Sequence, residues 1–121
     1  KRGPEERIYL DLHPKIAPVL AGVFPLVKKD GLLEKAEEIF KELEAYGFDA
    51  LFDEKGSIGK RYARIDEIGS PYAVTVDYET LKDNTVTLRE RNSLAQKRVK
   101  AEKLPELLWK LQAGKATFEK I

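Results

Sequence analysis

The sequence lacks cysteine altogether, and this absence excludes several kinds of chemistry. Without thiols, the 121-residue chain can form no disulfide, no thiolate nucleophile and no cysteine-based zinc site. Its single histidine cannot build a histidine-rich metal site, and we can assemble no Ser-His-acid arrangement around it. The lack of cysteine is compatible with a reducing, cytoplasmic setting. No apolar run approaches the roughly 20 residues that a membrane-spanning helix needs.

The chain also contains no methionine and begins with Lys1. We interpret this start as that of a piece excised from a longer protein, although trimming during maturation or cloning would leave the same start. The length suits one domain with a single core. We expect residues 1–15 to be a linker or a remnant strand of a preceding domain, and residues 16–121 to be the folded domain.

A net charge of only +1 hides segments of opposite sign. Residues 30–54 hold nine acidic residues against two lysines. Residues 55–64 hold four basic residues and no acid, and residues 89–100 hold five basic residues against one acid. If the fold brings the two basic segments together, they form a surface that attracts anions. The pattern is equally compatible with basic side chains that are merely solvated.

Strand and helix patterns alternate along the chain. Helical spacing of apolar residues predicts a helix capped by Asp30 and ended by Gly47, a second that ends at Gly69, and a third that starts at Pro105. The segments with strand patterns are residues 19–26, 48–52, 72–76, 85–91 and 95–99. This order predicts a three-layer α/β/α domain with a mixed, mostly parallel five-stranded sheet. In such sheets, ligands bind beyond the carboxyl ends of the parallel strands.

Residues 56–69, with the sequence GSIGKRYARIDEIG, begin at that edge of the predicted sheet. They do not match a Walker A loop, because only two residues separate Gly56 from Gly59 and Arg61 stands where that loop has Ser or Thr. They also lack the Gly-x-Gly-x-x-Gly fingerprint of dinucleotide sites. A KH domain has a Gly-x-x-Gly loop between two helices, whereas this one follows a strand. Cations near a helix start oppose the helix dipole, an arrangement that suits a bound phosphate.

Helical spacing within this run separates its side chains. It places Ile58, Tyr62, Ile65 and Gly69 against the sheet, Lys60, Arg64 and Glu67 on another side, and Arg61 and Ile68 between them. Asp66 and Glu67 are adjacent, so they cannot readily form a catalytic acid/base pair. Such carboxylates can instead accept hydrogen bonds from base amino groups. The alternative for Asp66 is an ion pair with a nearby arginine of its own helix.

Residues 56–69 resemble the signature of the C-terminal anticodon-binding domain of glycyl-tRNA synthetase, a class II enzyme, in its dimeric archaeal and eukaryotic form. The similarity extends over residues 8–112, with further matching segments at 16–18, 23–26, 74–77 and 87–93. The threonine, proline and histidine enzymes share the fold, but the sequence of residues 57–64 is specific to the glycine enzyme.

The resemblance implies a module that recognises the anticodon loop of glycine tRNA and positions the tRNA for aminoacylation by a catalytic domain that this chain lacks. It implies seven RNA-contacting candidates, which are Lys60, Arg61, Arg64, Asp66, Glu67, Arg89 and Arg91. We expect Arg61 and Arg64 to meet phosphates or base edges. We expect Asp66 or Glu67 to accept hydrogen bonds from cytosine amino groups.

The resemblance also implies that this chain lacks the catalytic part of the enzyme. We expect no catalytic residue, no cofactor and no aminoacylation by this piece alone, because the ATP-binding and dimerisation motifs of class II enzymes need a much larger catalytic domain. The full enzyme resembled is a cytoplasmic homodimer that uses ATP and magnesium; the isolated domain is expected to be a monomer without membrane contact. Two alternatives stay open: a same-fold accessory or nucleic-acid-binding subunit without tRNA specificity, and a small nucleotide-binding α/β protein.

Overall fold

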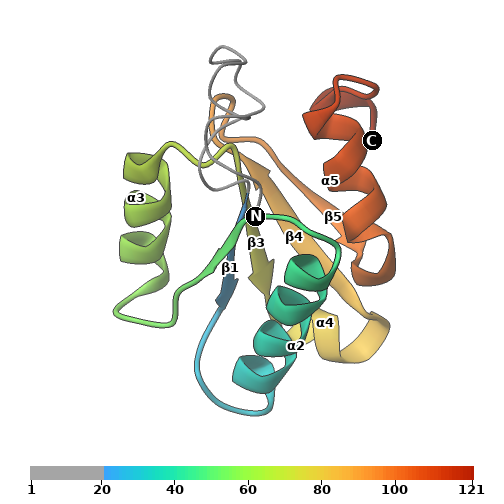
Figure 1. Ribbon diagram of the computed structural model, residues 1–121. Coiled ribbons are helices and arrows are strands. Elements are labelled where there is room, and N and C mark those ends of the chain that lie inside the picture. Colours follow the sequence, from blue (N-terminus) through green and yellow to red (C-terminus); the bar gives the residue numbers. More distant parts are fainter. Residues whose placement is uncertain (1–20) are drawn as a thin grey trace.

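A computed structural model describes residues 21–121, which form a five-stranded sheet with helices on both faces (Figure 1). The strands are β1 (Ala21–Pro25), β2 (Ala50–Phe52), β3 (Tyr72–Val76), β4 (Thr85–Glu90) and β5 (Gln96–Lys100). The helices are α2 (Leu32–Ala45), α3 (Ile58–Ile68), α4 (Tyr78–Asp83) and α5 (Leu104–Gln112), and short 3-10 helices occupy Ala101–Lys103 and Phe118–Lys120. The linker or remnant strand predicted at residues 1–15 lies outside the described residues.

The sheet is mixed, in the order β2-β1-β3-β4-β5. β1 pairs in parallel with β2 and β3, so that Val23 lies beside both Phe52 and Val74. β4 and β5 then add to β3 as two antiparallel strands. The predicted three-layer fold and mixed five-stranded sheet are thus confirmed, with the parallel pairings confined to β1, β2 and β3.

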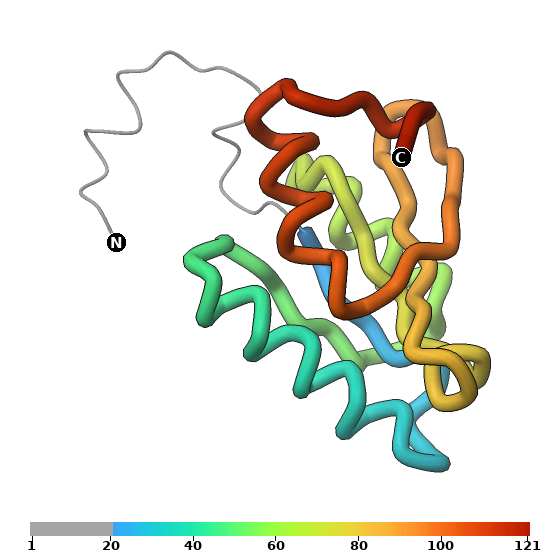
Figure 2. Tube along the Cα trace, turned by 90° about the vertical axis from the view of Figure 1, so that its right-hand side faces the viewer, coloured from blue at the N-terminus to red at the C-terminus, as the bar shows by residue number. Residues whose placement is uncertain are grey.

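The larger core lies on the face of the sheet that α2 and α5 cover. Figure 2 shows these two helices on the same side of the sheet. Their apolar stripes, which include Leu43 and Leu108, meet inward-facing strand residues such as Val74 and Leu88, all almost fully buried. Burying one such side chain stabilises the fold by roughly 1.5–3 kcal/mol.

A smaller core lies under α3 on the opposite face. It consists of Phe24, Ile65 and Ala73, with Leu51, Ile58 and Tyr62 packed against it. The helix approaches β1 closely at Gly22, where an added Cβ would lie 2.7 Å from the Ile65 Cδ1 atom. Within residues 21–121, no side chain of β4 or β5 joins this core. The α3 side of these two strands is therefore left to polar residues.

The predicted cap of the first helix is wrong, whereas its predicted end is confirmed. Gly31, with φ 87°, precedes α2, and no side chain caps the helix. Asp30 has φ 60°, and its carboxylate accepts a hydrogen bond from the Tyr78 hydroxyl at 2.7 Å. Two successive left-handed residues turn the Asp30 side chain away from the helix amides. Gly47, with φ 94°, follows the end of α2 as expected.

Helix α4 between β3 and β4 is an element that the sequence patterns did not predict. A capping box forms it: the Asp77 carboxylate accepts from the Thr80 amide at 3.2 Å, and the Asp77 amide donates to the Thr80 hydroxyl at 3.0 Å. Six residues are too few to display an apolar period, which explains why the pattern missed it. None of the helices within residues 21–121 is long and apolar enough to cross a bilayer.

Candidate nucleic-acid interface

Arg61 holds the loop that leads from β2 into α3. Its side chain is buried, with 3% of the residue exposed, and its guanidinium donates to the carbonyls of Lys55 at 3.2 Å, Gly56 at 2.7 Å and Pro25. These internal contacts argue against the expectation that Arg61 meets RNA. The loop folds back over position 61 of the helix, so the guanidinium satisfies the last carbonyl of β1 and two carbonyls of the loop after β2 instead of facing outward.

Arg64, one turn further along α3, lies at the surface in an ion pair. Its Nε and Nη2 atoms donate to the two oxygens of Asp53 at 2.8 and 2.9 Å, and Nη2 also donates to the Lys55 carbonyl at 2.6 Å. The hydrogen bond from Arg64 is the main reason that the Asp53 pKa lies below its ordinary value, and the same bond raises the pKa of Arg64. With 42% of its side chain exposed, Arg64 is charged, oriented and accessible.

Asp66 joins α3 to β4. Its carboxylate accepts two hydrogen bonds from Arg89, at 3.0 and 3.1 Å, and its backbone carbonyl accepts one from Arg91 at 3.0 Å. The Arg89 guanidinium carbon also lies 4.6 Å from the centre of the Tyr62 ring. The structure thus brings the two basic segments together, and the arginine beside Asp66 comes from a strand rather than from its own helix.

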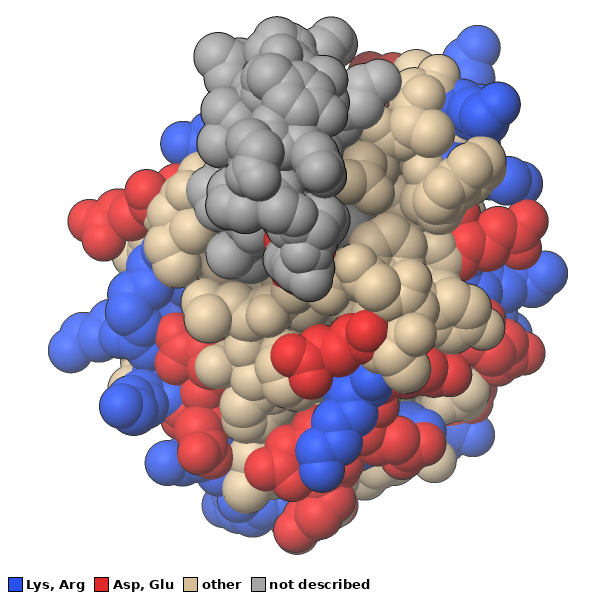
Figure 3. All heavy atoms as spheres, in the orientation of Figure 1, with Lys and Arg blue, Asp and Glu red and all other residues tan. Residues whose placement is uncertain are grey.

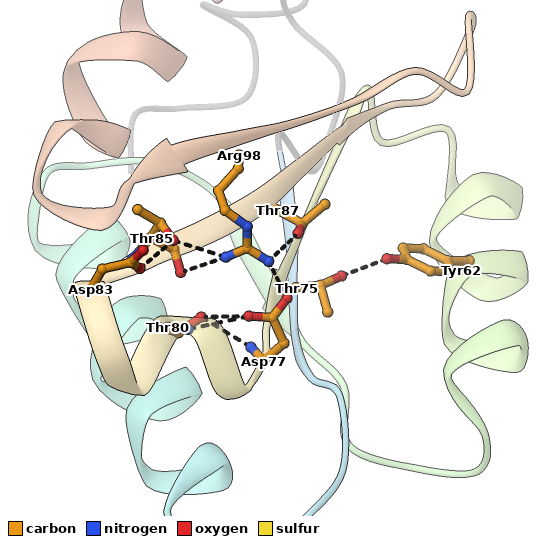
Figure 4. A network of polar contacts seen from close by, with 8 residues as sticks. All are labelled: Tyr62, Thr75, Asp77, Thr80, Asp83, Thr85, Thr87 and Arg98. Atoms are coloured by element: carbon orange, nitrogen blue, oxygen red, sulfur yellow. Dashed lines mark hydrogen bonds and ion pairs between the residues drawn. The ribbon is translucent and has the colours of Figure 1, made fainter.

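Polar side chains continue across the α3 side of β3, β4 and β5. We call this surface the polar sheet face and define it by Thr75, Thr87, Arg89 and Arg98. Thr87 pairs across the strands with both Thr75 and Arg98. The Tyr62 hydroxyl lies 2.5 Å from the Thr75 hydroxyl, which attaches α3 to this surface (Figure 4).

Arg98 is the centre of the network on this face. It donates to the Thr85 carbonyl and hydroxyl at 3.2 and 2.9 Å, to the Thr87 hydroxyl at 3.1 Å, and to the Asp77 carboxylate. Figure 4 shows its guanidinium pointing from β5 across β4 toward Asp77 at the end of β3. Sequence reasoning counted Arg98 only as a charge. Its alternation with Val99 could have placed it on the face that Thr87 shares.

The remaining candidates are exposed. Lys60, Glu67 and Arg91 lie at the surface, and within residues 21–121 neither Lys60 nor Glu67 forms an ion pair. The described residues also contain no group of three or more His, Cys, Asp or Glu side chains placed to hold a metal ion. This surface therefore offers fixed guanidinium groups, free charges at its edge, hydroxyl groups and one exposed carboxylate.

Asp77 is expected to make folding stability depend on pH. Partial burial alone would raise its pKa, but the hydrogen bond and charge of Arg98, together with the Thr80 bonds, hold the pKa below its ordinary value. The unfolded chain binds this proton first, near pH 4. The stabilisation is therefore complete above that pH and is lost as the pH falls through the folded-state pKa. Asp77→Asn keeps a helix-capping oxygen and should cost about 1 kcal/mol at pH 7, less at pH 3.

Urea unfolding of the variant and the native chain at pH 7, 5 and 3 measures the difference between their free energies of unfolding. Glu42→Gln on the exposed side of α2 removes an equal charge and should leave stability within about 0.5 kcal/mol at each pH. If Asp77→Asn lowered the free energy of unfolding as much at pH 3 as at pH 7, the ionised Asp77 carboxylate would not be the source of the pH dependence.

Comparison with known proteins shows to which protein family this chain belongs. The sequence profile described as anticodon binding domain matches residues 21–111. This chain belongs to the anticodon binding domain family. The match runs from the first residue of β1 into α5, so it includes both basic segments and the whole polar sheet face.

Two relatives of this anticodon-binding domain are glycine–tRNA ligases. The chain is 56% identical over 95 residues to the glycine–tRNA ligase of Borreliella burgdorferi, covering 78% of this chain and 21% of that protein. It is 49% identical over 110 residues to the glycine–tRNA ligase of Thermococcus sibiricus, covering 91% and 19%. The anticodon-binding domain thus spans about a fifth of the length of these curated relatives, and its predicted resemblance to the domain of the glycine enzymes is confirmed.

Solved structures agree on the fold. The RNA binding domain of threonyl-tRNA synthetase from Cryptosporidium parvum superposes with a TM-score of 0.73 at 23% identity, covering 81% of this chain and 24% of that one. Prolyl-tRNA synthetase from the same organism superposes with a TM-score of 0.72 at 19% identity, covering 84% of this chain and 23% of that one. At such low identities, the agreement concerns the architecture of the anticodon-binding domain alone.

Proposed function

We propose that this domain binds the anticodon loop of glycine tRNA as the RNA-reading part of a class II glycyl-tRNA synthetase. One observation carries the proposal: polar side chains rather than an apolar core occupy the α3 side of β4 and β5, in a chain that is about half identical to proteins named glycine–tRNA ligase. A single-stranded RNA loop exposes base edges and phosphates together, and both kinds of hydrogen-bonding partner are present here.

The side chains divide into roles by their contacts. Lys60 and Arg91, which are exposed at the edge, are suited to phosphates. Arg64 and Arg89 are oriented by carboxylates, and each has guanidinium N–H groups outside those ion pairs that can meet base edges. Glu67 is the exposed carboxylate that can accept from cytosine amino groups, because both oxygens of Asp66 already bind Arg89. Arg61 serves the loop rather than the RNA.

The proposal extends to the parts of the enzyme outside this chain. Residues 16–121 would form the anticodon-binding domain, and residues 1–15 would connect it to the preceding catalytic domain. ATP and magnesium would bind to that catalytic domain, which would aminoacylate the tRNA in the cytoplasm and form the homodimer. The isolated domain would be a monomer.

Binding of an anticodon stem-loop of glycine tRNA, followed by fluorescence anisotropy, tests the proposal. We expect saturable binding that weakens steeply as salt rises, with Lys60→Ala lowering the slope of log affinity against log salt by about 1. A stem-loop with a substituted anticodon should bind at least tenfold more weakly. Equal binding of both stem-loops, or of a DNA hairpin with the same sequence, would contradict the proposal.

A further inference from the structure

A second surface of the domain lies away from the polar sheet face, between α2 and α5. A pocket of about 390 Å³ opens there, lined by Tyr46, Phe48, Glu102, Pro105, Glu106 and Trp109. Tyr46 is 66% exposed and Trp109 is 50% exposed, so both rings present much of their surface at the pocket. We propose that this pocket is a docking site for an arginine side chain of a basic protein segment.

The lining favours a cation of this kind. Three aromatic side chains surround the pocket, and the face of an aromatic ring attracts ammonium and guanidinium groups. The Lys115 ammonium already lies 5.7 Å from the centre of the Trp109 ring. Two carboxylates, those of Glu102 and Glu106, stand at the same pocket and can accept the N–H groups of a guanidinium.

The carboxylates are accessible to such a partner. Glu106 forms a 3.1 Å ion pair with Lys110 and keeps 63% of its side chain exposed, while Glu102 accepts one hydrogen bond from the Asn84 amide at 3.0 Å. Exposed pairs of this kind contribute little to stability, so an incoming guanidinium can share or replace them at small cost.

The α2 side of the pocket carries the charge opposite to that of the proposed partner, whereas α5 and the residues after it place Lys110 beside Glu106 and Lys115 over Trp109. Helix α2 holds five glutamates against two lysines, and Figure 3 shows acidic side chains gathered over it in the lower part of this face. This charge attracts a basic segment and repels the phosphates of RNA. The pocket therefore needs a partner different from that of the polar sheet face.

A protein segment fits the site better than a free cation does. Tryptophan, tyrosine and arginine are the residue types that most often dominate binding energy at protein interfaces. The two exposed rings extend the apolar contact beyond the guanidinium, so they can hold the apolar neighbours of the docked arginine.

Trp109 is the single tryptophan of the chain, so its fluorescence reports directly on the pocket. We expect a blocked nonapeptide of alternating arginine and leucine to produce a saturable change in its emission. Glu102→Gln combined with Glu106→Gln should weaken this binding at least fivefold, and Tyr46→Ala should do so too. The matched control, Glu34→Gln combined with Glu37→Gln, removes the same charge from α2 outside the pocket and should weaken binding less than the pocket pair does, because it removes only screened attraction at a distance.

Four results would overturn the proposal: no saturable change, equal binding of a glutamate and leucine peptide, equal losses in the two double variants, or an emission change with an RNA hairpin alone. Tighter binding of a synthetic peptide of residues 1–20 would assign the pocket to the chain itself. Emission that changes with protein concentration alone would assign it to a second copy. Circular dichroism checks the fold of each variant, and unaltered anticodon stem-loop binding by the pocket variants keeps this test separate from that of the proposed function.

Discussion

Arg61→Ala is expected to lower the free energy of unfolding by about 3 kcal/mol, with a fall in melting temperature of roughly 15 °C. The substitution removes a buried guanidinium and leaves the carbonyls of Pro25, Lys55 and Gly56 without their donors. It also releases the loop that enters α3, so the cost combines unsatisfied carbonyls with lost order. Chemical denaturation and calorimetry of the purified domain measure both quantities.

The neighbouring residue provides the control. Lys60 is exposed, and Lys60→Ala should change stability by no more than about 0.5 kcal/mol. Arg61→Lys keeps the charge but not the planar fork, so it should fall between the two and give a folded sample if the alanine variant does not fold. An Arg61→Ala variant as stable as Lys60→Ala would contradict the structural role of this arginine.

Arg89→Gln is expected to weaken binding of the anticodon stem-loop about 30-fold, equivalent to about 2 kcal/mol. The change removes a guanidinium that Asp66 and the Tyr62 ring hold in place. Only 11% of the Arg89 side chain is exposed, so these contacts fix its position before RNA binds. It also leaves the Asp66 carboxylate without its partner, so that an unpaired negative charge would face the RNA. Anisotropy titrations well below the melting temperature separate this loss from any loss of fold.

Comparison variants sharpen this result. Adding Asp66→Asn to Arg89→Gln should recover part of the affinity, because the unpaired negative charge is then gone. Lys41→Gln on α2 removes the same positive charge from the other face and should change affinity less than twofold. A loss as large with Lys41→Gln would mean that net charge, rather than Arg89, governs binding.

The sequence predicted the architecture well where one physical signal dominated. β3 was expected at 72–76 and lies at Tyr72–Val76, because five apolar or β-branched residues stand between a proline turn and an aspartate. The end of α3 was predicted from Gly69, whose φ of 87° suits glycine. Helix α4 was missed because it depends on reciprocal hydrogen bonds between Asp77 and Thr80, which no periodicity reveals.

The candidate site was predictable as a set of segments but not as a set of contacts. The charge counts located the basic stretches that α3, β4 and β5 now bring side by side. Helical spacing placed Arg61 between two sides of α3 and Arg64 on another side, but it could not show that Arg61 is buried, because its burial depends on how residues 53–57 fold back. The carboxylates that pair with Arg89 and Arg98 lie 23 and 21 positions away, so only the fold could identify them.

The division of charge between the two faces of the sheet also affects how the domain meets a polyanion. Helix α2 holds five glutamates against two lysines on one face of the sheet, while Arg64, Arg89 and Arg98 lie on the other, so the domain has an uneven charge distribution across the sheet although its net charge is only +1. At physiological ionic strength its field extends only about 8 Å. The field therefore attracts RNA little over longer distances. At short range it orients the domain, so that a larger share of encounters begins with α3 toward the RNA.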